Sequence, residues 1–204
     1  MWIYTILDIE TNGLAATCDI LEVGYIQITN DAKIIRSGVF HFWKEGWDVG
    51  RTDIHGLTPE YLKQMCPDEA TFNGNLIRLY TLVQGSVLIG KNSNNFDIPV
   101  IRRFLHRNIN MLQDIALMGT LDLQEYYTDK FRKWYSDTYG VSAGRKKGTL
   151  EELIKMVGET ENSITEGYNK QISSERARAH SALYDAYMTY LLVIRGIERY
   201  NLKI

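Results

Sequence analysis

Hydrophobic and polar residues alternate along the first forty residues in the pattern of β-strands. An apolar run over 3–7 predicts a buried strand, which continues through Asp8-Ile9-Glu10 and breaks at the turn that follows. Segments 20–28 and 33–42 also read as strands, and Asn30-Asp31 between them is typical of a hairpin turn. We therefore expect one strand followed by an antiparallel pair.

The remainder of the chain predicts mainly helices, with short strands between them. Helices are predicted from Thr58-Pro59, over 68–82, from Asp97, over 149–156 and from 174 to about 199, and a short apolar strand is predicted over 86–90. A further strand and a short helix are expected between 110 and 127. Segments 43–57, 128–148 and 158–174 show little apolar periodicity and are expected to be loops.

Length and charge limit the possible classes of protein. With 204 residues, 45% hydrophobic and 24% charged, the chain is expected to form a single domain over 1–204 with a sizeable core. A net charge of −2 argues against a protein that holds long stretches of nucleic acid by electrostatics. It does not exclude an enzyme that holds a few nucleotides at a metal site.

Cysteine usage and the absence of targeting signals indicate a compartment. Cys18 and Cys66 form neither a disulfide framework nor a zinc-binding spacing, so both are expected to be free thiols in the reducing cytoplasm. No basic region precedes an apolar stretch at the N-terminus, as a signal peptide would require. The apolar segment 186–197 is interrupted by Arg195 and is short against the ~20 residues of a membrane span, so we expect a soluble protein.

The first strand ends in two carboxylates. Side chains two residues apart on a strand point to the same face, so Asp8 and Glu10 should project together while Ile9 points to the other side. Like charges in this arrangement repel, and a divalent cation with a preference for oxygen ligands would neutralise them. The alternative is an exposed strand end with two solvated acids, which is the commoner explanation for an isolated Asp-x-Glu.

The last helix contains a second pair of polar residues. His180 and Asp185 are five residues apart, so they would diverge by about 140° on one helix. Asp185 could then face a metal on the core side, while His180, at or just before the helix start, reaches the same pocket from its rim. A lone histidine on a helix is more often a surface or core residue than a catalytic one.

Four segments taken together resemble a known family. Segments 7–13 (LDIETNG), 54–60 (IHGLTPE), 92–99 (NSNNFDIP) and 178–186 (RAHSALYDA) closely resemble the ordered motifs of the DEDDh 3′-to-5′ exonucleases. This family includes the proofreading exonuclease subunits of bacterial replicative polymerases such as DNA polymerase III. The resemblance implies an α/β, ribonuclease H-like fold with a five-stranded mixed sheet flanked by helices, which agrees with the hydrophobic pattern.

The resemblance also implies roles for five residues. Asp8, Glu10, Asp97 and Asp185 match the four acids that bind two Mg²⁺ or Mn²⁺ ions, and His180 matches the general base that activates the attacking water. Two such metals stabilise both the attacking and the leaving oxygen of an in-line displacement at phosphorus. Imidazole is largely neutral near pH 7 and can accept a proton, and Asp8 is the natural bridge between the two ions.

Substrate contacts are implied at further positions, each with a simpler alternative. The positions implied to hold the terminal nucleotide are Thr11, Gly13, Leu14, His55, Leu57, Asn92 and Asn94. For Leu14 and Leu57, ordinary core packing explains an apolar residue as well as a contact with the base of the terminal nucleotide does. Loop asparagines such as Asn92 and Asn94 more often satisfy their own backbone than a phosphate or sugar.

The expected activity is hydrolysis of phosphodiester bonds at the 3′ end of DNA, preferably single-stranded, with release of nucleoside 5′-monophosphates. Trimming of RNA is an alternative that the sequence does not separate, and an inactive nucleic-acid-binding module on the same fold is a weaker one. A polymerase or another replication or repair protein is a possible partner.

Three segments depart from the family pattern. The third quoted segment has one residue more than the commonest form, and the loop over 43–51 matches nothing in the family. The stretch over 130–147 is also unmatched, and we favour a solvated loop over a nucleic-acid contact for its basic residues, which are Lys130, Arg132, Lys133, Arg145, Lys146 and Lys147.

Overall fold

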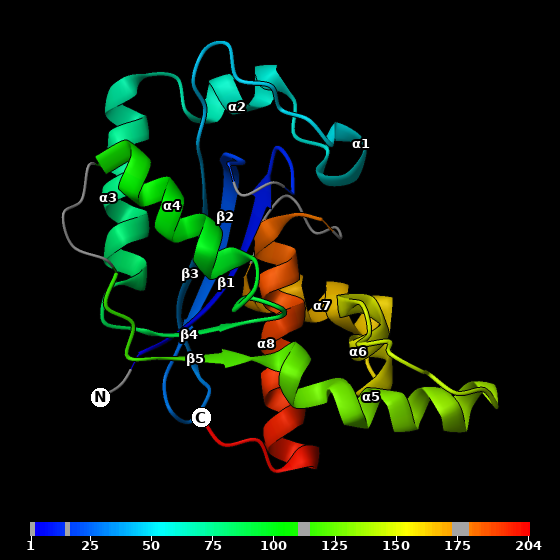
Figure 1. Ribbon diagram of the computed structural model, residues 1–204. Coiled ribbons are helices and arrows are strands. Elements are labelled where there is room, and N and C mark those ends of the chain that lie inside the picture. Colours follow the sequence, from blue (N-terminus) through cyan, green and yellow to red (C-terminus); the bar gives the residue numbers. More distant parts are fainter. Residues whose placement is uncertain (1–2, 15–16, 110–114, 173–179) are drawn as a thin grey trace.

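A five-stranded mixed sheet lies at the centre of the computed structural model, which describes residues 3–14, 17–109, 115–172 and 180–204 (Figure 1). The strand order is β3-β2-β1-β4-β5, with β1, β2 and β3 antiparallel and β4 and β5 parallel to β1. The expected sheet flanked by helices is therefore confirmed. The strands are β1 (Tyr4–Thr11), β2 (Ile20–Ile28), β3 (Ile34–His41), β4 (Val87–Gly90) and β5 (Gly119–Asp122).

Helices follow and connect the strands, and several begin at the capping residues that the sequence predicts. The side chain of Thr58 accepts a hydrogen bond from Tyr61 N at the start of α2, and Thr149 forms a capping box with Glu152 at the start of α6. The helices are α1 (Thr52–His55), α2 (Pro59–Met65), α3 (Glu69–Val83), α4 (Asp97–Ile109), α5 (Leu123–Tyr139), α6 (Leu150–Met156), α7 (Glu161–Gln171) and α8 (Ala182–Tyr200).

The sheet separates two hydrophobic clusters. One contains Phe72 of α3 and Phe104 of α4, and the other contains core residues of α5, α6, α7 and α8. Along β1, Leu7 and Ile9 belong to the α3–α4 side, whereas Ile6 belongs to the α8 side. Because strand side chains alternate between faces, Asp8 and Glu10 lie on the face covered by α8.

Three segments expected to be loops contain helices. Segment 43–57 includes the single turn α1, segment 128–148 is helical as far as Tyr139, and segment 158–174 contains α7. The apolar stripe of α7 consists of only two buried residues, Ile164 and Tyr168, which is too short to give a periodic signal. In α5 the buried residues beyond 124 are two aromatics, Tyr127 and Phe131, which stand among polar and charged residues, so the sequence shows little apolar periodicity after 127.

The last helix begins later than the sequence predicts. Residues 180 and 181 are not helical, and α8 starts at Ala182 rather than near 174. The parts of the earlier expectations that fall on 110–114 and 173–179 lie outside the described residues.

Two further expectations concern thiols and membrane spans. Cys18 and Cys66 are both buried and free, as expected, and burial raises the pKa of each thiol. No helix in the described part of the chain is long and apolar enough to cross a membrane.

Candidate active site

The two acids of β1 lie at its carboxyl end, beside β2. Asp8 is opposite Gly24 and Glu10 is opposite Glu22 in the antiparallel register. Asp8 and Glu10 therefore share a face with these two residues of β2 and project toward the start of α8.

Asp97 reaches this place from the other side of β1. β4 is parallel to β1, so the carboxyl ends of the two strands lie at the same edge of the sheet. The loop after β4 leads to α4, whose first residue is Asp97, and the backbone N–H of Ile9 donates a hydrogen bond to the Asp97 carboxylate. The buried Asp97 side chain thus lies against β1 at the residue between Asp8 and Glu10.

A buried carboxylate holds the loop that carries Asp97. Asp122, at the end of β5, accepts hydrogen bonds from the backbone N–H groups of Asn92 and Asn94, at 2.8 and 3.2 Å, and from Gln124 N at 3.0 Å. The same side chain caps α5. Asp122 therefore fixes the loop relative to the sheet, which limits the positions open to Asp97.

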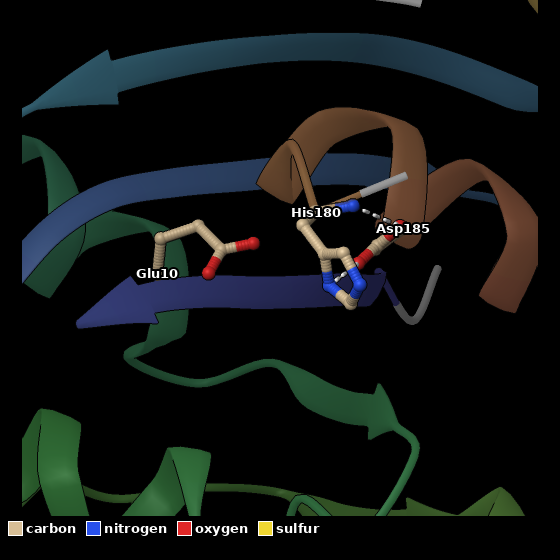
Figure 2. A group of neighbouring side chains, drawn as sticks. All are labelled: Glu10, His180 and Asp185. Carbon is tan, nitrogen blue, oxygen red and sulfur yellow. Dashed lines mark hydrogen bonds and ion pairs between the residues drawn. The ribbon is translucent and has the colours of Figure 1, made fainter. Parts of the chain in front are cut away.

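His180 and Asp185 complete the cluster from the start of α8 (Figure 2). Asp185 lies in the first turn and is buried, while the His180 side chain is 49% exposed. His180 has a left-handed backbone with φ of 60°, and its N–H donates to Asp185 Oδ1 at 3.3 Å. This tight turn brings His180 Nδ1 to 4.0 Å from Asp185 Oδ2, so the histidine lies just before the helix and faces the same pocket.

A glycine allows α8 to approach the sheet this closely. A Cβ placed on Gly24 would lie 2.1 Å from Leu183 N and 2.2 Å from the carbonyl carbon of Ala182. These are backbone atoms that cannot rotate away, so any side chain at this position would push the first turn of α8 off the sheet. Since Asp8 lies directly opposite Gly24, the contact places Asp185 close to Asp8.

Burial and mutual repulsion oppose ionisation of the acids. Burial, then the charges of Asp185, Asp97 and Glu10, raise the pKa of Asp8 well above its usual value. Burial raises the pKa of Asp97 to about 7, with Asp122 adding to the effect, and burial together with Glu151 raises that of Asp185 to about 7. The site has more negative charge than its own cations neutralise.

The donor atoms fit a divalent cation. Ligand atoms of Glu10, His180 and Asp185 lie within 4.8 Å of one another. Asp8 interacts electrostatically with Glu10 and Asp185 of this cluster and also with Asp97. Carboxylate oxygens are the ligands that Mg²⁺ and Mn²⁺ prefer, and a bound cation would relieve the repulsion that raises these pKa values.

The raised pKa values give an expected pH dependence of stability. In the metal-free protein, Asp97 and Asp185 retain protons up to about pH 7, whereas in the unfolded chain they lose them near pH 4, so the folded state binds more protons between these limits. The contribution of these acids to the free energy of unfolding therefore falls as pH rises from 5.5 to 8. Thermal unfolding with chelator, then with Mn²⁺, is expected to show a larger increase in Tm by the ion at pH 8 than at pH 5.5. An equal increase at both pH values would contradict binding of the ion by these acids.

The residues expected to contact substrate divide into exposed and buried positions. Leu14 is 74% exposed, so core packing does not explain it. Leu57 is fully buried in the hydrophobic cluster on the α3–α4 side, as the packing alternative predicts. His55 is also buried, and its Nδ1 accepts a hydrogen bond from Leu57 N.

The remaining candidate contacts lie in the turn after β1 and in the loop after β4. The Thr11 hydroxyl donates to the carbonyl oxygen of Gly13 at 2.7 Å and closes the turn. The side-chain oxygen of Asn92 accepts hydrogen bonds from the side chains of Asn95 and Gln124, and Asn94 is exposed. The Asn92 side chain is therefore bonded within the protein, but to neighbouring side chains and not to its own backbone as the simpler alternative expects.

Three polar residues around the site were not singled out from the sequence. They are Glu22, Lys91 and Asp122. Lys91 directly follows β4, and its charge lowers the pKa values of Asp97 and Asp185 against the larger effect of burial. Glu22 had a recognisable signal, because it is a carboxylate within a nine-residue strand that is buried at every position.

Comparisons with known proteins identify the family of the chain. The family model RNase_T, described as exonuclease, matches residues 5–193. The chain belongs to this exonuclease family. The expected family is thereby confirmed as that of the DEDD-type 3′-to-5′ exonucleases, with the ribonuclease H-like fold. No sequence among the curated proteins matches the chain.

Solved structures of exonuclease I share the fold. Escherichia coli exonuclease I in complex with a dA16 oligonucleotide superposes with a TM-score of 0.63 at 21% identity, over 98% of this chain and 42% of that chain. Exonuclease I from Methylocaldum szegediense gives 0.64 at 18% identity, over 98% and 41%. This exonuclease domain thus spans about two fifths of the length of those proteins.

Proposed function

We propose that this exonuclease domain removes nucleoside 5′-monophosphates one at a time from the 3′ end of single-stranded DNA. The observation that carries the proposal is the meeting of four carboxylates and a histidine at one edge of the sheet, from segments far apart in the chain. Single-stranded DNA is preferred as substrate because solved structures of E. coli exonuclease I, which has the same fold, contain single-stranded oligonucleotides.

Four acids of this site would hold the metal ions. Asp8 lies between the acids of β1, α4 and α8, so it is the best placed to contact two Mg²⁺ or Mn²⁺ ions, with Glu10, Asp97 and Asp185 as the other ligands. When bound, the ions would stabilise the attacking and leaving oxygens of the displacement at phosphorus. In their absence these side chains repel one another, which favours cation binding at this place.

His180 is proposed as the general base. Its imidazole is half exposed and lies at the rim of the cluster, where it can meet a water molecule and accept its proton. The hydrogen bond from His180 N to Asp185 fixes the backbone from which the ring projects.

The turn after β1 is the proposed seat of the 3′ nucleotide. Leu14 is exposed four residues after Glu10 and can contact the terminal base, and the Thr11 to Gly13 hydrogen bond holds the turn. Leu57 is buried in the hydrophobic cluster on the α3–α4 side, so the proposal gives it no direct contact with the nucleotide.

End-labelled oligonucleotides test the activity and its polarity. The protein is incubated with 5′-labelled and 3′-labelled DNA and RNA of the same sequence, with Mg²⁺, Mn²⁺ or chelator. We expect a labelled mononucleotide from the 3′-labelled DNA, a ladder of shortened 5′-labelled DNA, and no cleavage with chelator. Cleavage without metal, or mononucleotides released first from the 5′ end, would overturn the proposal. Faster cleavage of RNA would change the substrate and leave the mechanism intact.

A further inference from the structure

Glu22 is a buried carboxylate near the start of β2. Its side chain is fully buried, and it lies opposite Glu10 of β1 and opposite His41 of β3. Residues that pair directly across neighbouring strands share a face, so these three side chains form a row on the side of the sheet covered by α8. A buried carboxylate costs free energy unless it is well paired, so its presence here calls for a partner.

Glu22 contacts two groups with good geometry. Its Oε1 accepts a hydrogen bond from the backbone N–H of Ala182 at 2.8 Å, and its Oε2 lies 2.8 Å from His41 Nε2. His41 is held in turn, because its ring packs edge-on against Tyr61 and its carbonyl oxygen accepts from the Asn75 side chain. The carboxylate is thus fixed between His41, at the end of β3, and the start of α8.

The start of α8 needs such a partner. Helices begin with backbone N–H groups that have no acceptor within the helix, and a residue at the N-cap commonly supplies one. Here the N-cap residue Ser181 makes no side-chain capping bond within the described part of the chain. Glu22 of β2 supplies the acceptor, and its negative charge also interacts favourably with the positive end of the helix dipole.

We propose that Glu22 is a positioning residue, which fixes the first turn of α8 and thereby places His180 and Asp185 at the metal site. Ala182 lies between these two residues, and its N–H is the group that Glu22 holds. A shift of this turn would move the His180 imidazole and the Asp185 carboxylate relative to Asp8 and Glu10. Misplacement of catalytic groups by about 1 Å can cost about 10²-fold in rate. This inference rests on the proposed function.

Three substitutions separate the hydrogen bond from the charge. Glu22→Gln keeps the length of the side chain and an acceptor for Ala182 N, so we expect kcat within about threefold of the unchanged protein. Glu22→Asp keeps the charge but is one methylene shorter, and Glu22→Ala removes the acceptor. For both we expect kcat to fall by tenfold or more, KM for DNA to change less than twofold, and the Mn²⁺ concentration for half-maximal activity to rise.

Gln27→Ala is the matched control on the same strand. Gln27 is also buried, and its side chain makes two hydrogen bonds, to Thr5 and Arg36, away from the start of α8. We expect Gln27→Ala to lower Tm, as Glu22→Ala does, while leaving kcat unchanged.

A measurement without metal or substrate gives an independent readout. In the metal-free protein, the amide proton of Ala182 should resonate downfield because it is bonded to a carboxylate, and it should move upfield in Glu22→Asp and Glu22→Ala but not in Gln27→Ala. If Glu22→Ala does not fold, the proposal is tested by comparing kcat of Glu22→Gln and Glu22→Asp. We expect the higher kcat for Glu22→Gln, and a higher kcat for Glu22→Asp would overturn the proposal. Equal kcat in Glu22→Ala and Gln27→Ala would also overturn it. An unchanged protein without nuclease activity would contradict the proposed function, whereas the amide shifts would still report on the helix cap.

Discussion

Asp8→Asn is expected to reduce hydrolysis of 3′-labelled DNA by about 10³-fold or more, because loss of about 4 kcal/mol of transition-state stabilisation corresponds to that factor. The substitution keeps the shape of the side chain but removes a buried carboxyl group that interacts with Asp185, Asp97 and Glu10. The same variant is expected to have a higher Tm than the unchanged protein in chelator at pH 8, since one repelling charge is gone from the buried cluster. Activity is measured by release of labelled mononucleotide, and stability by thermal unfolding.

Asp129→Asn is the control for this experiment, because the Asp129 side chain is 96% exposed on α5 and the change in net charge is the same. It should leave both activity and Tm nearly unchanged. Equal activity of Asp8→Asn and Asp129→Asn would contradict the proposed metal site.

His180→Ala is expected to reduce the rate by about 10²-fold or more while Mn²⁺ still binds, as follows for the loss of a general base. Because the His180 side chain is half exposed, added imidazole should reach the vacated space and restore part of the rate. The measurements are the rate of mononucleotide release with and without imidazole, and the increase in Tm on addition of Mn²⁺.

His106→Ala, on the exposed face of α4, is the matched control and should neither lose activity nor respond to imidazole. A ring nitrogen of His180 lies within 4.8 Å of carboxylate oxygens of Glu10 and Asp185. The experiment therefore also tests whether His180 is a metal ligand. If His180→Ala lost the stabilisation by Mn²⁺ together with activity, His180 would be a metal ligand instead of a base.

Local rules predicted much of the fold. The alternation in the first forty residues correctly gave β1, β2 and β3, and Thr58, Asp68 and Thr149 were found at helix starts where their side chains cap the backbone. These predictions succeed because strand alternation and capping depend on residues close together in the chain. The strand β5 and the start of α5 lie between 110 and 127, where a strand and a short helix are expected, but the extension of α5 to Tyr139 and the whole of α7 are not predicted. Both helices are stabilised by packing against other helices rather than by a long apolar stripe.

The helix start at Ala182 shows the limit of periodicity. Residues 180 and 181 could continue a helix by composition, but His180 adopts a left-handed backbone and α8 begins two residues later. The contacts that go with this start are the Gly24 approach and the hydrogen bond to Glu22, and both come from β2, more than 150 residues earlier in the chain. No pattern near residue 180 contains this information.

The sequence by itself indicated the candidate residues for the chemistry, and it determined that Asp8 and Glu10 share a face, since the period of a strand is a local property. Its order of motifs was also sufficient to indicate the exonuclease family. Only the tertiary structure decided that Asp97 and Asp185 meet these acids, because their approach depends on the parallel pairing of β1 with β4 and on the close contact of α8 with Gly24. The raised pKa values follow from that assembly, because burial and neighbouring charges change the pKa of an acid only when the fold brings the groups together. The positions of these acids in the sequence do not show that they are close in space.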